Sequence, residues 1–314
     1  MANSDSSDNG QNRRIDWLAE QIAHHSALYY NQAKTEIPDS EFDALWDELM
    51  QLDASHPQLQ RVGAEIDPGT VKVDHMFPMR SLNKGTADED IDHFVRESSL
   101  EATRFISQPK LDGSALSLEY RKGRLVRAAT RGSGNRGEDV TKNARRVENV
   151  PGTLGAEVDV HIRGEVVMRK STFEERYADV SPNPRNLAAG ALRQKKAEGK
   201  ANASDLVFLA YDAKFPDEPL RHPDSSPPPA VNNDSEILSW LMEIAGVIPA
   251  PWIITESINP TELTSGLCKE TEKWTSQREG YEFEIDGLVF KVDDLSKRDL
   301  LGMTAHHPRW ALAW

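Results

Sequence analysis

The chain has 314 residues, a length that suits two domains, or one large domain with an appendage. Hydrophobic residues make up 38% and charged residues 28%, which is the balance of an ordinary globular protein. No apolar run approaches the ~20 residues that cross a bilayer, and the polar start lacks the apolar core of a signal peptide. The single cysteine, Cys268, excludes an internal disulfide and a multi-cysteine zinc site. We therefore expect a cytoplasmic protein that does not enter a membrane.

The formal net charge is −14, with 37 Lys and Arg against 51 Asp and Glu. This charge argues against a protein that coats nucleic acid, because such proteins are usually basic. Positive residues nevertheless gather in two segments, 131–146 and 185–200. A local basic groove and a mixed, solvated surface both fit this distribution.

The N-terminal part of the chain has the pattern of two helices after a polar tail. Residues 1–12 are rich in Ser, Asp, Asn and Gly, so we expect them to be unstructured. Apolar residues then recur at helical spacing in two runs, Ile15, Leu18, Ile22 and Tyr29, and Phe42, Leu45, Leu49 and Leu52. Pro38 and the candidate N-cap Asp39 separate the runs. We predict a small helical subdomain over residues 13–57.

From about residue 70 the pattern changes to strands. Residues 114–132 alternate apolar and polar side chains on both sides of Lys122-Gly123, which predicts a β-hairpin. Similar patterns predict strands at 158–168 and 283–292, helices at 183–196 and 235–246, and a loop at the Pro- and Ser-rich segment 214–234. The sum is an α+β domain with antiparallel sheets over residues 58–314.

Lys110 is the first candidate for chemistry, in the sequence Gln108-Pro109-Lys110-Leu111-Asp112-Gly113. A lysine amine is a nucleophile only when it is neutral, and burial or cationic neighbours favour the neutral form. A strand that leads into this segment would hold Lys110 rigidly. The alternative is an ordinary solvated lysine beside an Asp-Gly turn, since the tetrapeptide by itself is common.

A glycine-rich segment at 130–139 is the second candidate. Gly132, Gly134 and Gly137 would let the backbone approach a ligand closely, and Arg131 would contact phosphate or ribose oxygens. A flexible surface turn is the alternative.

Glu165 is the third candidate, because a carboxylate in an apolar strand needs a partner such as a ribose hydroxyl. A glutamate on the solvated face of that strand fits equally well.

The segment 284–291 is the fourth candidate, since Lys291 closes a strongly apolar strand and suits a contact with phosphate. Glu284 and Asp286 would hold Mg²⁺ or Mn²⁺, which prefer carboxylates together with substrate phosphates. Asp286 and Lys291 point to opposite faces of a regular strand unless Gly287 forms a bulge. The alternative for Lys291 is a strand-end lysine.

The pair His24 and His25 has no supporting metal ligands in the adjacent sequence.

These segments form an ordered set that extends over nearly the whole chain after residue 12. The set is HHSALYYNQAKTEIPDSEFD, SLNK, PKLDG, ATRGSGNRGEDVT, RGEVVM, NPRNLAAGALRQ, EIDGLVFKV and PRWALAW. In this order and combination the sequence resembles the bacterial NAD-dependent DNA ligases. The resemblance implies a nucleotidyltransferase fold, similar to ATP-grasp, with an N-terminal helical subdomain.

The resemblance also implies which residues bind NAD. The helical subdomain of the family caps the nicotinamide mononucleotide (NMN) half of NAD, and its positions here are Tyr29, Tyr30, Asp39, Ser40, Glu41, Phe42 and Asp43. The positions that contact the adenosine half are Ser81, Leu82, Gln108, Arg131 and Glu165, and Tyr211 is similar to the aromatic residue that stacks on adenine.

By the same resemblance, Lys110 attacks the α-phosphorus of NAD, releases NMN and carries AMP as a phosphoramidate. Lys291 and Mg²⁺ would neutralise the charge that develops on the phosphate. Arg185 and Arg193 fall where the family binds phosphate or nicked DNA. The resemblance implies a monomer that passes AMP to the 5′-phosphate of nicked double-stranded DNA before the strand is sealed.

Several positions differ from the family pattern. In the family a lysine that contacts the AMP phosphate follows the PRWALAW-like residues, and a barrel, a zinc finger, a helix-hairpin-helix region and a BRCT domain come later. The 314 residues end at Trp314, which fits either a fragment or a natural truncation. Phe42, Gln108 and Ser133 replace customary Tyr, Glu and Asp residues, and each change would weaken NAD binding modestly. A catalytically impaired module that binds NAD or DNA is the alternative function.

Overall fold

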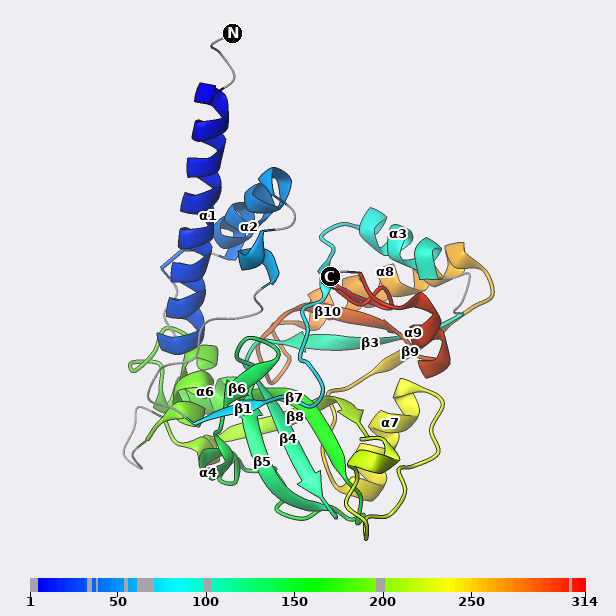
Figure 1. Cartoon of the computed structure of the whole chain (residues 1–314). Helices are drawn as coiled ribbons and strands as arrows, with labels where there is room; N and C mark the ends of the chain where they lie inside the picture. Colours follow the sequence, from blue (N-terminus) through cyan, green and yellow to red (C-terminus); the bar gives the residue numbers. More distant parts are fainter. Residues whose placement is uncertain are drawn as a thin grey trace. The chain divides into compact units, whose positions relative to one another are not determined.

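The computed structural model describes residues 5–32, 36–37, 39–53, 56–60, 71–98, 103–195, 201–304 and 307–314 (Figure 1). These residues belong to two compact units, and each is described by itself. The first contains Met1–Met79 and Arg131–Glu138, and the second contains Arg80–Thr130 and Asp139–Trp314. Among the described residues, no helix is both long and apolar enough to cross a membrane.

The first unit contains the predicted pair of helices. Its helical elements are α1 (Asp5–Gln32), α2 (Asp39–Leu52) and the short 3-10 helix η1 (Pro57–Gln60). Leu18 and Ile22 of α1 pack against Leu49 of α2, and all three side chains are fully buried. Leu59 of η1 completes this cluster. The apolar spacing in the sequence therefore identified both helices and the faces that bury them.

The limits of the helical part differ from the expected range of 13–57. Helix α1 begins at Asp5, inside the segment 1–12 that we expected to be unstructured. No apolar residue precedes Ile15 in this helix, so hydrophobic spacing could not indicate its first turns. At the other end, Leu59 belongs to the helical core, so the packed part continues past Pro57.

The glycine-rich segment also belongs to the first unit. Strand β1 (Lys72–Asp74) pairs antiparallel with β6 (Arg136–Glu138). Gly134 has a φ of 85°, and its carbonyl accepts a hydrogen bond of 2.8 Å from the amide of Met79. The segment is therefore a turn that is hydrogen-bonded to residues 72–79.

Two sheets form the second unit. One has five strands in the order β2-β11-β10-β3-β9, and the other has four strands in the order β5-β4-β7-β8. The strands are β2 (Asn83–Lys84), β3 (Arg104–Leu111), β4 (Ser114–Arg121), β5 (Arg124–Thr130), β7 (Val160–Met168), β8 (Leu206–Lys214), β9 (Ile253–Glu256), β10 (Ile285–Val292) and β11 (Ala311–Ala313). All neighbouring strands are antiparallel except β2 and β11. The predicted α+β class with antiparallel sheets is confirmed.

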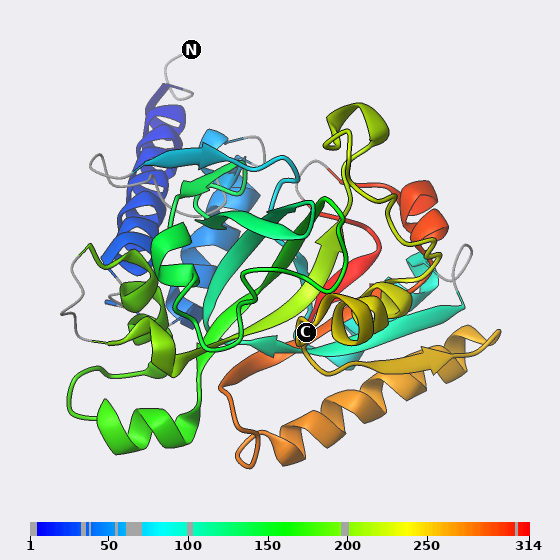
Figure 2. The same ribbon diagram turned by 90° about the horizontal axis from the view of Figure 1, so that it is seen from below.

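Helices cover one face of the five-stranded sheet, as Figure 2 shows for α8. The helical elements of this unit are α3 (Asp88–Ser98), α4 (Thr141–Ala144), α5 (Lys170–Arg176), α6 (Pro184–Arg193), η2 (Ala203–Asp205), η3 (Glu218–Leu220), α7 (Asp234–Trp240), η4 (Leu241–Ala245), α8 (Pro260–Gln277) and α9 (Leu295–Leu301). Phe94 of α3 and Leu267 of α8 pack on Phe105 and Phe290 of the sheet. Ile106, on the opposite face of β3, packs with residues of the four-stranded sheet.

Most of the predicted elements of this unit are present. The hairpin β4–β5 turns at Lys122 and Gly123, which both have positive φ, as a two-residue turn of this type requires. The predicted strands are β7 and β10, and the predicted helices are α6 and α7. The Pro- and Ser-rich segment contains only η3, so it is a loop as expected.

Candidate active site

Strand β3 positions Lys110 on the face of the five-stranded sheet that is turned toward the four-stranded sheet. Side chains alternate along a strand, so Lys110 and Gln108 share the face of Ile106, whereas Phe105 and Leu111 pack on the helical face. Gln108 is buried, but 39% of the Lys110 side chain is exposed. Lys110 is therefore held by a rigid strand and is still open to a substrate.

A bulge in β10 brings Asp286 to Lys110. Ile285 pairs with Leu111 and Leu288 pairs with Pro109, so β10 advances three residues while β3 advances two. Gly287 lies at this irregularity with a φ of 151°. Ile285 and Leu288 both pack on the helical face, which leaves Asp286 on the side of Lys110. Lys110 Nζ lies 2.6 Å from Asp286 Oδ2.

The same bulge settles the orientation of Lys291. Lys291 pairs with Ile106 of β3, and paired residues project from the same face of a sheet. Lys291 therefore shares a face with Lys110 and Asp286, as the sequence predicted for the case in which Gly287 forms a bulge.

Arg185 reaches the site from the first turn of α6. Its Nη1 donates to Asp112 Oδ1 at 2.5 Å, two residues after Lys110. Burial lowers the pKa of Arg185 to about 10, and the nearby carboxylate of Asp286 opposes that shift. The turn itself is packed tightly, because a Cβ on Gly113 would lie 2.2 Å from the carbonyl oxygen of Val166 in β7. Two acids and two cations thus surround the end of β3.

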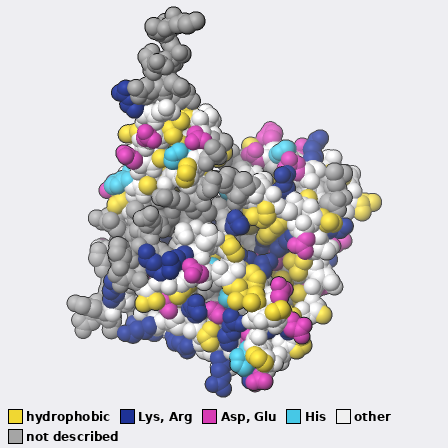
Figure 3. Space-filling view, viewed as in Figure 1, with side chains coloured by type: hydrophobic (Ala, Val, Ile, Leu, Met, Phe, Trp, Pro, Cys, Tyr) yellow, Lys and Arg dark blue, Asp and Glu magenta, His cyan; other side chains and the backbone are white. Residues whose placement is uncertain are grey.

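Arg193 is not part of this cluster. It ends α6, eight residues after Arg185, which corresponds to about 12 Å along a helix. The structure therefore brings only Arg185, of the two arginines predicted to bind phosphate or DNA, to the segment of Lys110. On the face drawn in Figure 3, Lys and Arg side chains are interspersed with Asp and Glu.

Lys291 is buried between the two sheets. Its Nζ lies 2.6 Å from Asp234 Oδ2 and donates to the carbonyl of Tyr211 at 3.0 Å. Burial lowers the pKa of Lys291, and the carboxylate of Asp234 opposes that shift. Tyr211 lies where the register of β7 and β8 shifts, between Asp212 and Ala210. A bulged residue is left out of the ladder, so its carbonyl is available to this lysine.

Sequence reasoning missed the buried charged residues around Lys291. Arg163 of β7 forms an ion pair with Asp212 of β8, and both are largely buried. Burial raises the pKa of Asp212, but the cations Arg163, Lys214 and Lys291 together outweigh burial, so the net pKa is below the ordinary value. Asp234 of α7 was also missed. A charged residue inside an apolar strand, such as Arg163 or Asp212, was the signal that could have identified this layer.

The positions that the resemblance assigns to adenosine lie in different places. Ser81 and Leu82 precede β2, and the Ser81 carbonyl is 3.2 Å from His307 Nδ1. Gln108 Nε2 donates to the carbonyl of Ala250 at 3.4 Å. Glu165 is half-buried in β7 beside Gly113. Arg131 belongs to the first unit and is described only there.

The positions assigned to the NMN half are less fully described. The side chains of Tyr29, Tyr30, Asp39, Ser40 and Asp43 lie outside the described part of the structure. Glu41 is exposed, and the half-buried ring of Phe42 packs against the helical core, 6.3 Å from the ring of Trp46.

Among the described residues, one group of three possible metal ligands lies within coordinating distance, and it does not include Glu284 or Asp286. Glu284 Oε1 lies 3.9 Å from Lys170 Nζ, and Asp286 contacts Lys110, so this site offers two carboxylates. In the first unit, His24 and His25 have a neighbour that the sequence did not indicate. Glu36 Oε2 is 3.3 Å from His24 Nε2, and ligand atoms of the three residues lie within 4.8 Å of one another. Glu36 is a possible third ligand that the sequence beside the histidine pair did not indicate, because residues 12 apart come together.

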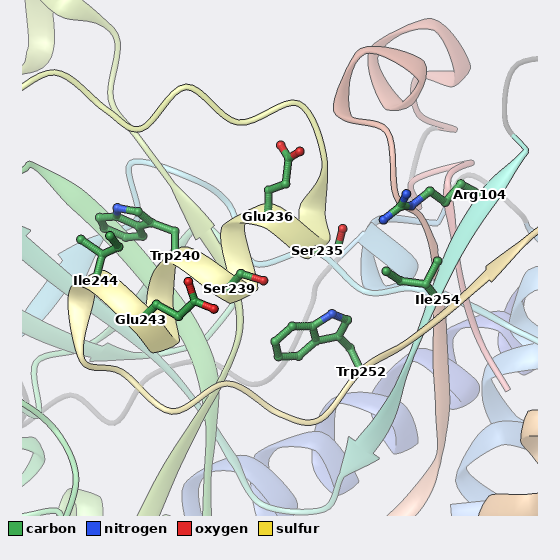
Figure 4. A pocket seen from close by; sticks show the side chains of 9 residues that line it. All are labelled: Arg104, Ser235, Glu236, Ser239, Trp240, Glu243, Ile244, Trp252 and Ile254. Carbon is green, nitrogen blue, oxygen red and sulfur yellow. The ribbon is translucent and has the colours of Figure 1, made fainter.

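A pocket of about 430 Å³ lies elsewhere in the second unit (Figure 4). Its walls include Ser235, Trp252 and Ile254, and Arg104 lines it from the start of β3. Arg104 precedes Lys110 by six residues, or about 20 Å of extended strand. None of the predicted site residues that the structure describes lines this pocket, so the candidate active site is the open surface around Lys110.

Comparison with protein families decides the relationship. Residues 69–314 match the NAD-dependent DNA ligase adenylation domain, and residues 8–64 match the DNA ligase-like N-terminal NAD⁺-binding domain. The chain belongs to the NAD-dependent DNA ligase family. The resemblance seen in the sequence is thereby confirmed.

Curated members of this ligase family are similar over almost the whole chain. A DNA ligase of Brevibacillus brevis is 35% identical over 96% of this chain and 45% of its own length. Those of Alkalilimnicola ehrlichii and Aquifex aeolicus are 36% and 34% identical, over 45% and 42% of their lengths. The chain thus spans less than half the length of these DNA ligases.

Solved structures of other ligases are more distant from this ligase-family chain. The ATP-dependent DNA ligase of bacteriophage T7 is 16% identical, with a TM-score of 0.37 over 69% of this chain and 64% of its own. An archaeal ATP-dependent RNA ligase is 14% identical, with a TM-score of 0.42 over 79% of this chain and 50% of its own.

Proposed function

We propose that this chain adenylates itself at Lys110, with NAD as the donor of AMP and NMN as the product. The observation that carries the proposal is the contact of 2.6 Å between Lys110 Nζ and Asp286 Oδ2 at a bulge of β10. It joins two of the segments on which the family resemblance rests. Phosphoryl transfer needs positioned charges more than covalent help from the protein, and the site supplies them.

In this mechanism Asp286 accepts the proton that Lys110 must lose, because its carboxylate is already within hydrogen-bonding distance of Nζ. The lone pair of Lys110 then forms a P–N bond to the α-phosphorus. The P–O bond to the bridging oxygen breaks, and NMN leaves with the electron pair. Arg185 and Lys291 would stabilise the charge on the phosphate oxygens, as fixed cations do in other phosphoryl transfers.

The oxygen donors of this site suit Mg²⁺ when the substrate phosphates supply further ligands. Mg²⁺ is usually bound by one or two carboxylates and phosphate oxygens, and Asp286 and Glu284 are the carboxylates available. When bound, the ion would supply Lewis-acid neutralisation of the phosphate charge. Asp286 would then have two uses, as a proton acceptor and as a metal ligand.

We assign the NMN half of NAD to the helical residues 13–57 and the AMP half to residues 58–314. The match of residues 8–64 to an NAD⁺-binding domain supports this division. We retain Tyr29, Tyr30, Asp39, Phe42 and Asp43 as contacts for NMN. Tyr211 is retained for adenine stacking.

The wider activity follows from the family. The relatives are DNA ligases, and we propose that the AMP on Lys110 passes to the 5′-phosphate of nicked double-stranded DNA. We assign Arg193, at the far end of α6 from Arg185, to a contact with DNA rather than with the reacting phosphate. We propose a monomer that acts in the cytoplasm.

Intact mass spectrometry tests the proposal. The protein is incubated with NAD and Mg²⁺, and we expect a gain of one adenylyl group. Lys110→Ala should abolish the gain, and Lys273→Ala, an exposed lysine on α8, should leave it unchanged. ATP in place of NAD should give no adduct. Binding of NAD without any adduct would reject self-adenylation and favour the alternative of a cofactor-binding module.

A further inference from the structure

Asp234 is the acidic partner of Lys291, and it is fully buried as the first residue of α7. A second cation also contacts this Oδ2, because Arg298 Nη2 of α9 lies 2.9 Å away. Arg298 is itself fixed, since its Nε donates to the carbonyl of Val292 at 2.6 Å. One carboxylate oxygen thus lies between two buried cations from two different elements.

The position of Asp234 does not depend on Lys291. Asp293, the residue after β10, accepts hydrogen bonds from the amide and the hydroxyl of Ser235, each at 2.8 Å. Asp293 also accepts from Arg104 Nε at 2.6 Å, and its carbonyl accepts from the amide of Asp234. Figure 4 shows the side chains of Ser235, from the start of α7, and Arg104, from β3. The start of α7 is therefore attached to the sheet independently, and it presents its carboxylate to Lys291.

The charges around Lys291 come from three elements. Asp234 of α7 and Asp212 of β8 favour its ammonium form, whereas Arg298 of α9 and burial oppose it. Asp212 is already paired with Arg163, so Asp234 is the nearest carboxylate that acts on Lys291. Without Asp234, a buried ammonium would remain beside a guanidinium with little compensation.

We propose that Asp234 is a positioning residue for the self-adenylation reaction, which holds Lys291 charged and directed at the face of Lys110. This inference rests on the proposed function, in which Lys291 stabilises the phosphate charge. It assigns a role to a residue that lies outside all of the motifs that indicated the family.

The pH profile of self-adenylation separates this role from a merely structural one. Loss of a carboxylate in contact shifts the titration of a lysine by about one to three pH units. We therefore expect Asp234→Asn to move the alkaline limb of the rate profile downward by at least about one unit. Arg298→Gln removes the opposing cation and should move the limb upward. Glu243→Gln, at an exposed acid of η4, should leave the limb unmoved.

A second readout does not require any adenylation. The NAD-free protein is acetylated with an N-hydroxysuccinimide ester at several pH values, and the label on Lys291 is measured by peptide mass spectrometry. We expect Asp234→Asn to increase labelling of Lys291 about tenfold at pH 8 relative to an exposed reference lysine. Arg298→Gln should decrease it, which tests the pair even if the Asp234 variant does not fold.

The outcomes are distinct. If the parent protein forms no adduct but labelling follows the expected pattern, the charge pairing is right and the proposed function is wrong. If the adduct forms but neither variant moves the limb or the labelling, Asp234 has no positioning role. An equal loss of rate at every pH would also overturn the inference, because it would mean that Asp234 only supports the fold.

Discussion

The carbonyl oxygen of Trp314 occupies the space that a Cβ on Gly287 would need, at a separation of 2.0 Å. The two segments are joined at this point, since Leu288 and Trp314 exchange backbone hydrogen bonds of 2.8 and 2.9 Å. The bulge that turns Asp286 toward Lys110 is thus held between β3 on one side and the end of the β11 segment on the other. A side chain at Gly287 has no room there.

We predict that Gly287→Ala destabilises the protein and slows self-adenylation. The φ of 151° is a region that L-residues rarely adopt, and the clash is with backbone rather than with a flexible side chain. A cost of roughly 1–3 kcal/mol in the free energy of unfolding is expected. Chemical denaturation measures the cost, and the intact-mass assay measures the rate.

Gly190→Ala is the matched control for this substitution. Gly190 lies inside α6, and a Cβ there would meet nothing within 4 Å. Alanine in an open helical position should stabilise the protein by roughly 0.5–1 kcal/mol. Equal effects of the two substitutions would mean that the bulge does not constrain the site.

Asp286→Asn should slow formation of the adduct by about 100-fold or more, which is the usual contribution of a positioned proton acceptor. Asparagine keeps the size of the side chain but does not accept the proton from Lys110. Because 29% of the Asp286 side chain is exposed, the melting temperature should change little. Glu279→Gln, an exposed acid just before β10, serves as the control. A rate within threefold of the parent would assign the proton to another acceptor.

The sequence predicted local structure well where a single strand or helix determines it. The turn at Lys122-Gly123 and the run of Lys291 were correct because alternation and turn chemistry act within a few residues. The motifs around Lys110 and Asp286 were identified by resemblance. Their contact was not predicted, since it joins residues 176 positions apart through a bulge.

The buried ion pairs show the same limit. Asp234 follows a long loop and has no local pattern that pairs it with Lys291. Its partnership depends on how Asp293 fixes the start of α7, a contact across 58 residues. The length of α1 was also missed, because helix turns without apolar residues leave no periodic signal.

The environment of Asp159 predicts that the stability of the protein depends on pH. Burial raises its pKa, but hydrogen bonds from Ser225, His222 and Lys122, with the ion pair to Arg121, outweigh burial and bring the pKa to about 2. These bonds join the β4–β5 turn to the Pro- and Ser-rich loop. One carboxylate therefore links this turn to the loop.

A carboxylate whose pKa is lowered in the folded state stabilises the protein above its ordinary pKa, and the contribution is lost as the pH falls. We expect Asp159→Asn to lower the free energy of unfolding by about 1.5–3 kcal/mol at pH 7. The difference from the parent should stay constant down to about pH 5 and shrink between about pH 4 and pH 2. Urea denaturation at a series of pH values measures it. A difference that grows on acidification would have the wrong sign.

The reactivity of Cys268 reports whether α3 and α8 stay packed on the helical face of the sheet. The pKa of its thiol is raised to about 11, by burial and by the nearby carboxylate of Asp88 at the start of α3. Only the thiolate reacts with iodoacetamide, and an ordinary cysteine has a pKa near ~8.5. At pH 8 we therefore expect the native protein to be alkylated about 100-fold more slowly than the unfolded chain.

Because the sequence contains one cysteine, total alkylation reports this site alone. Asp88→Asn removes a neighbouring negative charge and should speed alkylation, whereas Asp217→Asn, at an exposed position before η3, should not. If the native protein reacts as fast as the unfolded chain, α3 and α8 must separate readily in solution. The packing of α3 and α8 over Phe105 and Phe290 would then not be needed to hold β3 and β10 in register beside Lys110.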